Sequence, residues 1–330
     1  MLIEVSESSQ AGEARRRAVA CAEELEFDET RCGAVGIAAT EMASNLVKHA
    51  GKGSILLESI QDNGDSALRM MAVDRGPGIT DLAIAMTDGH STVGTMGSGL
   101  GAIRRLSDVF EVYSGPNLGT VVRADFWRKT AKAPVSTRPL QIGVVSEPIA
   151  GEDVCGDGWA VRSISGAVLM LVVDGLGHGA MAHEAAEEAK RVLLETTHFG
   201  PERIVHDVHG ALKKTRGAAM AIAKLDLQKQ VLQFAGVGNI GASIVSPDSS
   251  RGLPSHNGTL GQHFTRVQEF SYPWNPDNIL VMHSDGLATR WDLRKYPGIW
   301  NKHPSIIAAL LHRDFGRGRD DVTVFVARNA

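Results

Sequence analysis

The sequence predicts two α+β domains joined by a linker. A chain of 330 residues exceeds what one hydrophobic core usually organises, so two domains of ordinary size are expected. Residues 129–139 lack apolar periodicity, contain two prolines and are rich in small and cationic side chains, which is typical of an interdomain linker. We therefore place the domains at residues 1–128 and 140–330, each with both helical and strand-like patterns.

The first domain is predicted to pack helices on a sheet. Apolar residues recur at helical spacing over residues 11–25 and 30–50, and Gly51 stands where a C-terminal helix cap belongs. Strand-like runs then alternate with turn residues such as Asp62-Asn63-Gly64. These strands are expected at residues 55–60, 68–73, 109–113 and 120–126. Helices followed by paired strands form a helix-on-sheet layer.

The second domain is predicted to contain more strands than helices. Strands are expected at residues 140–145, 159–163, 168–173, 218–225, 231–235, 279–283 and 322–327. Helical patterns cover residues 181–194, 201–214 and 305–312. The sequence shows no internal repeat.

Composition excludes several classes of protein. The net charge is −4, and lysine and arginine are spread along the chain, so nucleic acid is not an expected partner. The longest apolar run, residues 167–173, is far shorter than the roughly 20 residues that cross a bilayer, and no signal peptide is visible. Three cysteines without CxxC spacing indicate neither disulfides nor zinc. We expect a soluble, cytoplasmic protein of undetermined oligomeric state.

A polar stripe marks the second predicted helix. Glu41, Asn45 and His49 are spaced by four, so a helix would hold them on one side. The asparagine oxygen suits Mg²⁺, which prefers hard oxygen ligands. The glutamate suits the orientation or deprotonation of a hydroxyl group. On its own, such a stripe is typical of a solvated helix face.

Two glycine-rich segments follow this helix. Asp74-x-Gly76-x-Gly78 ends a predicted strand, where glycines allow close approach of a ligand. Gly97-x-Gly99-x-Gly101 opens a predicted helix that carries Ile103, Leu106 and Val109, and amides at such a helix start suit phosphate. Neither segment is a Rossmann fingerprint or a P-loop. Singly, each is typical of a turn.

Taken in order with Gly119-Thr120, these motifs resemble the GHKL (Bergerat, or HATPase) ATP-binding domain of gyrase, Hsp90, histidine kinases and MutL, over about residues 10–127. The resemblance implies Glu41 as catalytic base, Asn45 as ligand of the Mg²⁺ that accompanies ATP, and Asp74 as adenine contact. It also implies a lid at residues 81–96. The remaining nucleotide-binding positions would be Gly76, Gly78, Gly97, Gly99, Gly101 and Thr120.

Residues Gly89-His90-Ser91-Thr92 make this domain similar to the serine kinases that regulate bacterial sigma factors, especially the stressosome switch kinase. A histidine kinase is disfavoured because no dimerisation domain with a phosphoacceptor histidine precedes the site. His49 is therefore expected to be structural.

Aspartates at predicted strand ends mark the second domain. Asp174-Gly175 follows the strand at 168–173, Asp285-Gly286 follows 279–283, Asp320-Asp321 precedes the last strand, and Asp157 is a fourth. Singly, an Asp-Gly pair is typical of a β-turn. Together, without cysteine or histidine at metal-ligand spacing, they favour two Mg²⁺ or Mn²⁺ ions over zinc. Such ions activate water and neutralise phosphoryl oxygens.

A protein nucleophile is not predicted in this domain. Ser284 lies beside Asp285, but the GxSxG pattern of a nucleophile elbow is absent. His178 and His183 are five residues apart, which does not match a helical zinc pair, so capping or surface roles are expected for both.

The series Gly151 to Asp157, Asp174 to Gly179, Ser284 to Gly286 and Asp320 to Thr323 resembles the PPM serine/threonine phosphatases, particularly the SpoIIE-like sporulation branch and its stressosome feedback phosphatase. The resemblance covers about residues 140–328 and implies a β-sandwich flanked by helices. It implies that Asp174 and the Gly175 carbonyl bridge two metals, with Asp157, Asp285 and Asp320 completing the shell. Asp321 competes with Asp320, and Asp153 with Asp157. The phosphate-binding arginine of eukaryotic members is not located.

Both resemblances imply one substrate: a serine or threonine of a STAS-domain anti-sigma antagonist or stressosome scaffold protein. The expected function is bifunctional, with the N-terminal domain adding phosphate from ATP and the C-terminal domain removing it. One alternative is an ATP-regulated phosphoserine phosphatase without kinase activity. Another is a non-enzymatic N-terminal domain that sequesters a sigma factor or other regulator.

Overall fold

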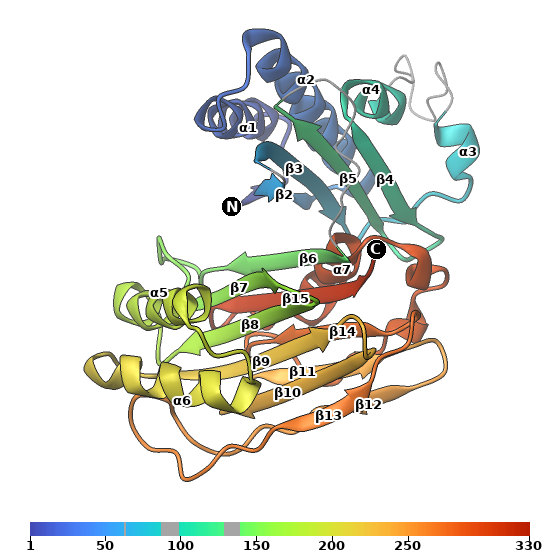
Figure 1. Cartoon of the computed structure of the whole chain (residues 1–330). Coiled ribbons are helices and arrows are strands. Elements are labelled where there is room, and N and C mark those ends of the chain that lie inside the picture. Colours follow the sequence, from blue (N-terminus) through green and yellow to red (C-terminus); the bar gives the residue numbers. More distant parts are fainter. Residues whose placement is uncertain (63, 87–98, 129–138) are drawn as a thin grey trace. The chain divides into compact units, whose positions relative to one another are not determined.

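The computed structural model describes residues 1–62, 64–86, 99–128 and 139–330, and it contains two compact units, Met1–Thr137 and Arg138–Ala330 (Figure 1). The proposed linker at 129–139, apart from Pro139, lies outside the described residues. Among the described helices, none combines the length and the apolar composition needed to span a membrane.

The N-terminal unit packs helices on one face of an antiparallel sheet with strand order β1-β2-β3-β5-β4. This confirms the predicted helix-on-sheet layer. Its strands are β1 (Leu2–Val5), β2 (Gly53–Asp62), β3 (Asp65–Asp74), β4 (Val109–Ser114) and β5 (Thr120–Trp127). Its helices are α1 (Gln10–Glu24), α2 (Glu29–Asn45), α3 (Leu82–Ala85) and α4 (Gly99–Leu106), with a π-helical turn η1 (Leu46–Ala50).

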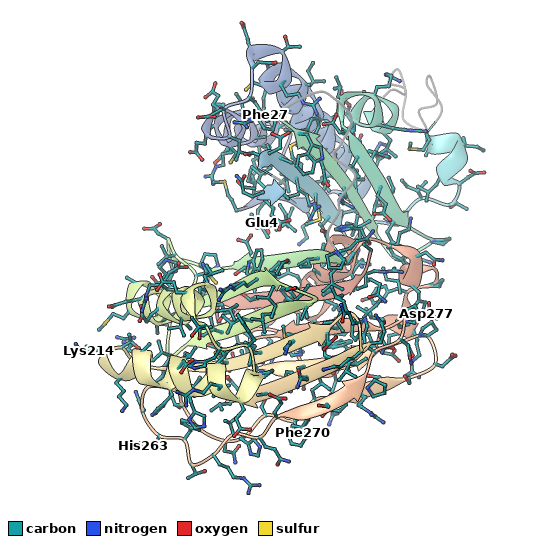
Figure 2. All side chains as sticks on the ribbon, in the orientation of Figure 1. Glu4, Phe27, Lys214, His263, Phe270 and Asp277 are labelled. Atoms are coloured by element: carbon teal, nitrogen blue, oxygen red, sulfur yellow. The ribbon has the colours of Figure 1, made fainter. Side chains whose placement is uncertain are left out.

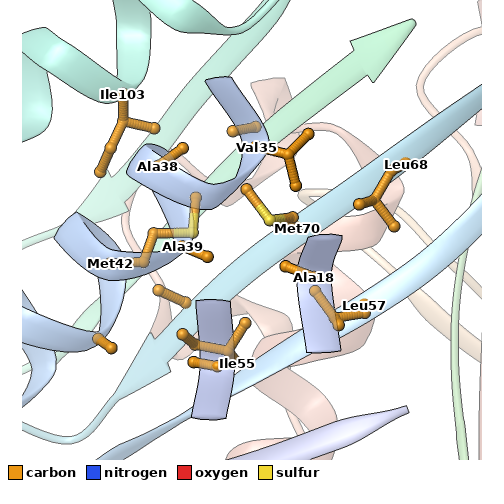
Figure 3. Packing of buried hydrophobic residues seen from close by; sticks show 14 of the residues in the cluster. Ala18, Val35, Ala38, Ala39, Met42, Ile55, Leu57, Leu68, Met70 and Ile103 are labelled. Carbon is orange, nitrogen blue, oxygen red and sulfur yellow. The ribbon is translucent and has the colours of Figure 1, made fainter. Parts of the chain in front are cut away.

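Small residues let the helices approach the sheet closely. Helix α1 buries Ala14, Ala18 and Ala22, and α2 places Val35 and Met42 in the same core (Figure 3). Helix α2 begins at the side-chain cap of Asp28, which accepts a hydrogen bond from the Arg31 amide at 2.7 Å. The core therefore orders α2, the helix that carries Glu41 and Asn45.

The helical segment predicted at residues 30–50 does continue to Ala50, with Gly51 as its C-terminal cap, although α2 ends at Asn45 and the last turn, η1, is π-helical. Val109 was assigned both to the glycine-loop helix and to the strand at 109–113; the helix assignment was wrong, because α4 ends at Leu106 and Val109 pairs with Asp125 in β4.

The C-terminal unit is a sandwich of two antiparallel sheets. Residues 139–330 are all described, and their ten strands form sheets in the orders β13-β10-β9-β8-β7 and β12-β11-β14-β15-β6. The strands are β6 (Leu140–Glu147), β7 (Asp157–Ile164), β8 (Ala167–Gly175), β9 (Ala218–Asp226), β10 (Val231–Val237), β11 (Gly241–Val245), β12 (Ser250–Gly252), β13 (Phe270–Pro273), β14 (Ile279–His283) and β15 (Val322–Asn329).

Helices cover the outer faces of this sandwich. Helices α5 (Ala180–Glu195) and α6 (Pro201–Ala211) pack on β7 to β10, and α7 (Pro304–Phe315) packs on β6 and β15. A short 3₁₀ turn, η2 (Leu212–Lys214), follows α6. Apolar side chains from both sheets, such as Phe234 and Phe325, fill the space between them. The predicted β-sandwich flanked by helices is confirmed.

Candidate functional site

The N-terminal site is built where the start of α4 meets α2. A Cβ atom placed on Gly99 would lie 3.0 Å from Asn45 Oδ1 and 3.3 Å from Glu41 Oε2. Both side chains are half-buried. The polar stripe of α2 therefore faces the first turn of α4, whose amide groups carry the positive end of the helix dipole.

Asp74 forms a second part of this site. Its Oδ1 atom accepts hydrogen bonds from the amides of Gly76 at 2.7 Å and Thr120 at 3.1 Å. A Cβ on Gly76 would lie 2.8 Å from Ala50 Cβ, so this turn packs against the end of η1. Gly78 has φ of +75°, and a Cβ there would lie 1.9 Å from the Gly115 carbonyl oxygen. Only glycine fits at that position.

The described positions fit a nucleotide. The side chains of Glu41 and Asn45 lie beside the first turn of α4. The carboxylate of Asp74 accepts hydrogen bonds from the backbone amides of Gly76 and Thr120. Gly101 is buried within α4. Gly97, the segment Gly89 to Thr92 and most of the expected lid lie outside the described residues, although Asp81 is described and caps α3 through the Ile84 amide.

The C-terminal site gathers aspartates from both sheets. Asp157 in β7 pairs directly with Asp174 in β8. Asp285 follows β14 and Asp320 lies just before β15. The charges of Asp157, Asp285 and Asp320 all act on Asp174. The strand ends predicted from sequence therefore come together; we call these four residues the acid cluster.

Hydrogen bonds join the two sheets at the acid cluster. Ser284 Oγ donates to Asp157 Oδ2 at 2.5 Å and accepts from the Thr323 amide at 2.9 Å. Asn239 donates to Asp285 Oδ2 at 2.7 Å and also to the Asp174 carboxylate. Ser284 is thus a positioning residue for a carboxylate, a role that the sequence did not predict.

The acid cluster is electrostatically strained. Burial, with the charges of Asp321 and Asp320, raises the pKa of Asp157 to about 7. Burial and the charges of Asp157, Asp285 and Asp320 raise the pKa of Asp174 to about 8. Burial also raises the pKa of Asp320, which the charge of His178 lowers in part. Like charges held close together in a partly buried site disfavour the ionised forms of the carboxylates.

This donor set fits hard divalent cations, since every side chain in it supplies oxygen. As the side chains stand, no three carboxylate, histidine or cysteine groups within the described residues meet closely enough to enclose an ion. Gly175 is required beside the cluster, because a Cβ there would lie 2.1 Å from the Ala182 carbonyl oxygen.

The structure separates the competing aspartates. Both oxygens of Asp321 accept backbone hydrogen bonds, from the Ile149 amide at 2.7 Å and the Gly156 amide at 2.8 Å. Asp321 therefore braces the 149–156 loop; its charge acts on Asp157, whereas the charge of Asp320 acts on both Asp157 and Asp174. Asp153 is exposed, whereas Asp157 is buried within the cluster.

The two histidines lie outside the cluster. His178 Nδ1 is 2.7 Å from Glu152 Oε1, and His183 Nδ1 is 2.9 Å from the Cys155 carbonyl oxygen. Asn239 was missed by sequence reasoning. Its signal was weak: a polar residue after Gly238 at the end of strand β10.

Comparison with known proteins gives a family for each unit. Residues 5–126 match the histidine kinase-like ATPase domain, and residues 164–329 match Stage II sporulation protein E (SpoIIE). Serine/threonine-protein kinase RsbT of Bacillus subtilis (strain 168) is 40% identical over 106 residues, which cover 32% of this chain and 80% of RsbT. Phosphoserine phosphatase RsbX of the same organism is 25% identical over 138 residues, covering 42% and 69%.

Solved structures agree with these matches. A chain from the bacterial stressosome, described as a modular system adapted to control secondary messenger signaling, superposes with a TM-score of 0.55 and 29% identity, covering 58% of this chain and 100% of that one. RsbX in complex with magnesium shares the fold, with a TM-score of 0.51 and 23% identity over 58% of this chain and 96% of RsbX. The chain therefore belongs to the SpoIIE family and joins a PPM-type phosphatase fold to an N-terminal histidine kinase-like ATPase domain of the RsbT type.

Proposed function

We propose that this chain both adds and removes phosphate on a serine or threonine of a partner protein. The acid cluster carries the proposal: four carboxylates from the strand ends of both sheets, with raised pKa values at Asp157, Asp174 and Asp320, suit metal-dependent phosphate hydrolysis. Similarity to RsbT supports the opposing kinase activity in the N-terminal unit.

In the phosphatase, Asp157, Asp174, Asp285 and Asp320 would hold two Mg²⁺ or Mn²⁺ ions, with the Gly175 carbonyl as a further ligand. When bound, the ions activate water and neutralise the phosphoryl oxygens. Ser284 and Asn239 orient the carboxylates through their hydrogen bonds. Asp321 keeps the 149–156 loop in place beside them. Such outer hydrogen bonds hold ligands in the geometry that a metal requires.

In the kinase, Glu41 would accept the proton of the substrate hydroxyl as its oxygen attacks the γ-phosphorus of ATP. The bond from that phosphorus to the bridging oxygen breaks, and ADP leaves. Asn45 would hold Mg²⁺, and the first turn of α4 would bind phosphate. Asp74, fixed by the Gly76 and Thr120 amides, would accept a hydrogen bond from the adenine amino group.

The proposed substrate is a STAS-domain anti-sigma antagonist or stressosome scaffold protein. The relatives support this class, since RsbX is a phosphoserine phosphatase and one structural match is a stressosome chain. A phosphate adds about −1.5 to −2 charges at pH 7, which is enough to weaken a docked interface. The ratio of the two activities would then set how much partner is free to bind.

Transfer of labelled γ-phosphate from ATP to a STAS-domain protein tests this proposal. The Asp174→Asn variant is used so that the label is not removed again. We expect stable label that disappears when Glu41→Ala is added, and loss of the label on addition of wild-type protein with Mn²⁺. Absence of label despite measured ATP binding would instead indicate a nucleotide-regulated phosphatase. Label that survives wild-type protein with Mn²⁺ would refute the phosphatase activity.

A further inference from the structure

The turn Thr215–Gly217 lies directly against the loop that follows Asp174. Strands β8 and β9 pair Asp174 with Ala219 and Gly175 with Ala218. Beyond the ladder, the Leu176 amide donates to the Gly217 carbonyl oxygen at 2.9 Å. This antiparallel register brings Arg216 opposite Gly177, three residues after Asp174 in the chain.

Several contacts hold this turn in position. Gln262 Nε2 donates to the Arg216 carbonyl oxygen at 2.5 Å, and Thr215 Oγ1 accepts from the Gly217 amide at 3.1 Å. Gly217 has φ of +87°, and a Cβ there would lie 2.5 Å from the Leu260 carbonyl oxygen. No larger residue fits, so the backbone that presents Arg216 is fixed.

The Arg216 side chain reaches over the loop of the acid cluster. A Cβ on Gly177 would lie 3.1 Å from Arg216 Nη1, so the guanidinium rests on this glycine. Arg216 is exposed, and within the described residues its guanidinium has no hydrogen bond or ion pair. A cation therefore lies against the loop that follows Asp174, with its donors available to a ligand.

The chemistry of the substrate calls for such a cation. Two divalent ions would neutralise the four carboxylates and leave the dianionic phosphate of phosphoserine unmatched. His178 is a cation whose charge acts on the cluster, at Asp320. A guanidinium presents a planar fork of donors that matches phosphate oxygens.

We propose that Arg216 binds the phosphate group of the phosphoserine substrate at the edge of the acid cluster. This inference rests on the proposed phosphatase function. Arg216 lies in the turn just before β9, which begins at Ala218. Its role is recognition of substrate phosphate rather than binding of metal.

The test compares wild-type protein with Arg216→Ala, Arg216→Lys and Lys214→Ala. Lys214, labelled in Figure 2, is an exposed cation two residues away and serves as the matched control. With a phosphoserine peptide and Mn²⁺, we expect Arg216→Ala to raise KM by about 10- to 100-fold, the effect of losing charge-assisted hydrogen bonds. We expect Arg216→Lys to recover part of this loss and Lys214→Ala to leave KM unchanged. Stabilisation by Mn²⁺ should be equal in all four proteins.

A binding measurement separates this inference from the proposed function. A fluorescent peptide carrying a non-hydrolysable phosphonate in place of phosphoserine is titrated with each Mn²⁺-loaded protein. Weaker binding by Arg216→Ala than by Lys214→Ala supports the inference even if wild type shows no turnover, an outcome that would count against the phosphatase alone. Equal binding and equal KM in Arg216→Ala and wild type would overturn it.

Discussion

Replacing Asp157 by asparagine should stabilise the C-terminal unit when no metal is present. The pKa of Asp157 is raised from 3.8 to about 7. At ~1.4 kcal/mol per pKa unit, the ionised carboxylate therefore lowers the free energy of unfolding by about 4 kcal/mol at pH 8. Asparagine keeps the shape and removes the charge. The substitution also weakens the hydrogen bond from Ser284 Oγ, and this loss offsets about 2 kcal/mol of the gain in stability. The expected net gain is therefore about 2 kcal/mol.

The effect should depend on pH with a definite sign. Because the folded pKa of Asp157 lies above the unfolded value, the folded unit binds more protons between pH 4 and 7. Wild-type stability without metal should therefore rise as the pH falls from 8 towards 5. The Asp157→Asn variant should show less of this rise.

Metal should reverse the order of stability. Mn²⁺ at about 100 times its dissociation constant stabilises a folded protein that binds it by about 2.7 kcal/mol. Wild type should gain this amount, and Asp157→Asn should gain little because it lacks a ligand. Pulse proteolysis in urea, with the C-terminal fragment quantified, measures both states for the full chain. Asp153→Asn, an exposed change, is the control. A variant less stable than wild type in EDTA at pH 8 would refute the electrostatic reasoning.

Three further predictions concern other contacts. Burial alone would raise the pKa of Asp125, but the charges of Arg69 and Arg123 hold this pKa well below its usual range. The N-terminal unit should therefore lose stability as the pH falls below about 4. In urea titrations, Asp125→Asn should lower the free energy of unfolding by about 3–5 kcal/mol at pH 7 and flatten this dependence on acid pH. Gly78→Ala should abolish ATP binding measured by calorimetry. Gly51→Ala, at φ of +77° with open space around it, should cost about 1–3 kcal/mol of stability and leave ATP binding intact. Asn239→Ala should weaken Mn²⁺ binding about 10-fold in calorimetric titrations, because it removes the hydrogen bonds that hold the carboxylates of Asp174 and Asp285. Asn301→Ala changes an exposed asparagine elsewhere in the same unit and should leave Mn²⁺ binding unchanged.

The sequence pattern was sufficient to predict helices and strands whose apolar residues follow a long, regular periodicity. Helix α1 and the central strands β3, β8 and β15 were predicted to within a few residues, because long apolar periodicity records burial directly. Strands β1, β11, β12 and β13 were not predicted. Each has three to five residues, and β12 is fully exposed. Such short strands owe their conformation to the neighbouring strand rather than to their own sequence.

Some residues of the candidate sites were likewise predicted from the sequence, and others were identified only in the tertiary structure. The sequence alone identified the strand-end aspartates, since glycine turns after buried strands stand out in a linear pattern. Only the tertiary structure distinguished Asp320 from Asp321, because that choice depends on which carboxylate meets the Ile149 and Gly156 amides. It alone brought Asn239 to the acid cluster and Arg216 to the loop that follows Asp174. Their positions follow from pairing between strands that are distant in the chain. Contacts of this kind produce no local sequence pattern, so they could not be predicted from the sequence.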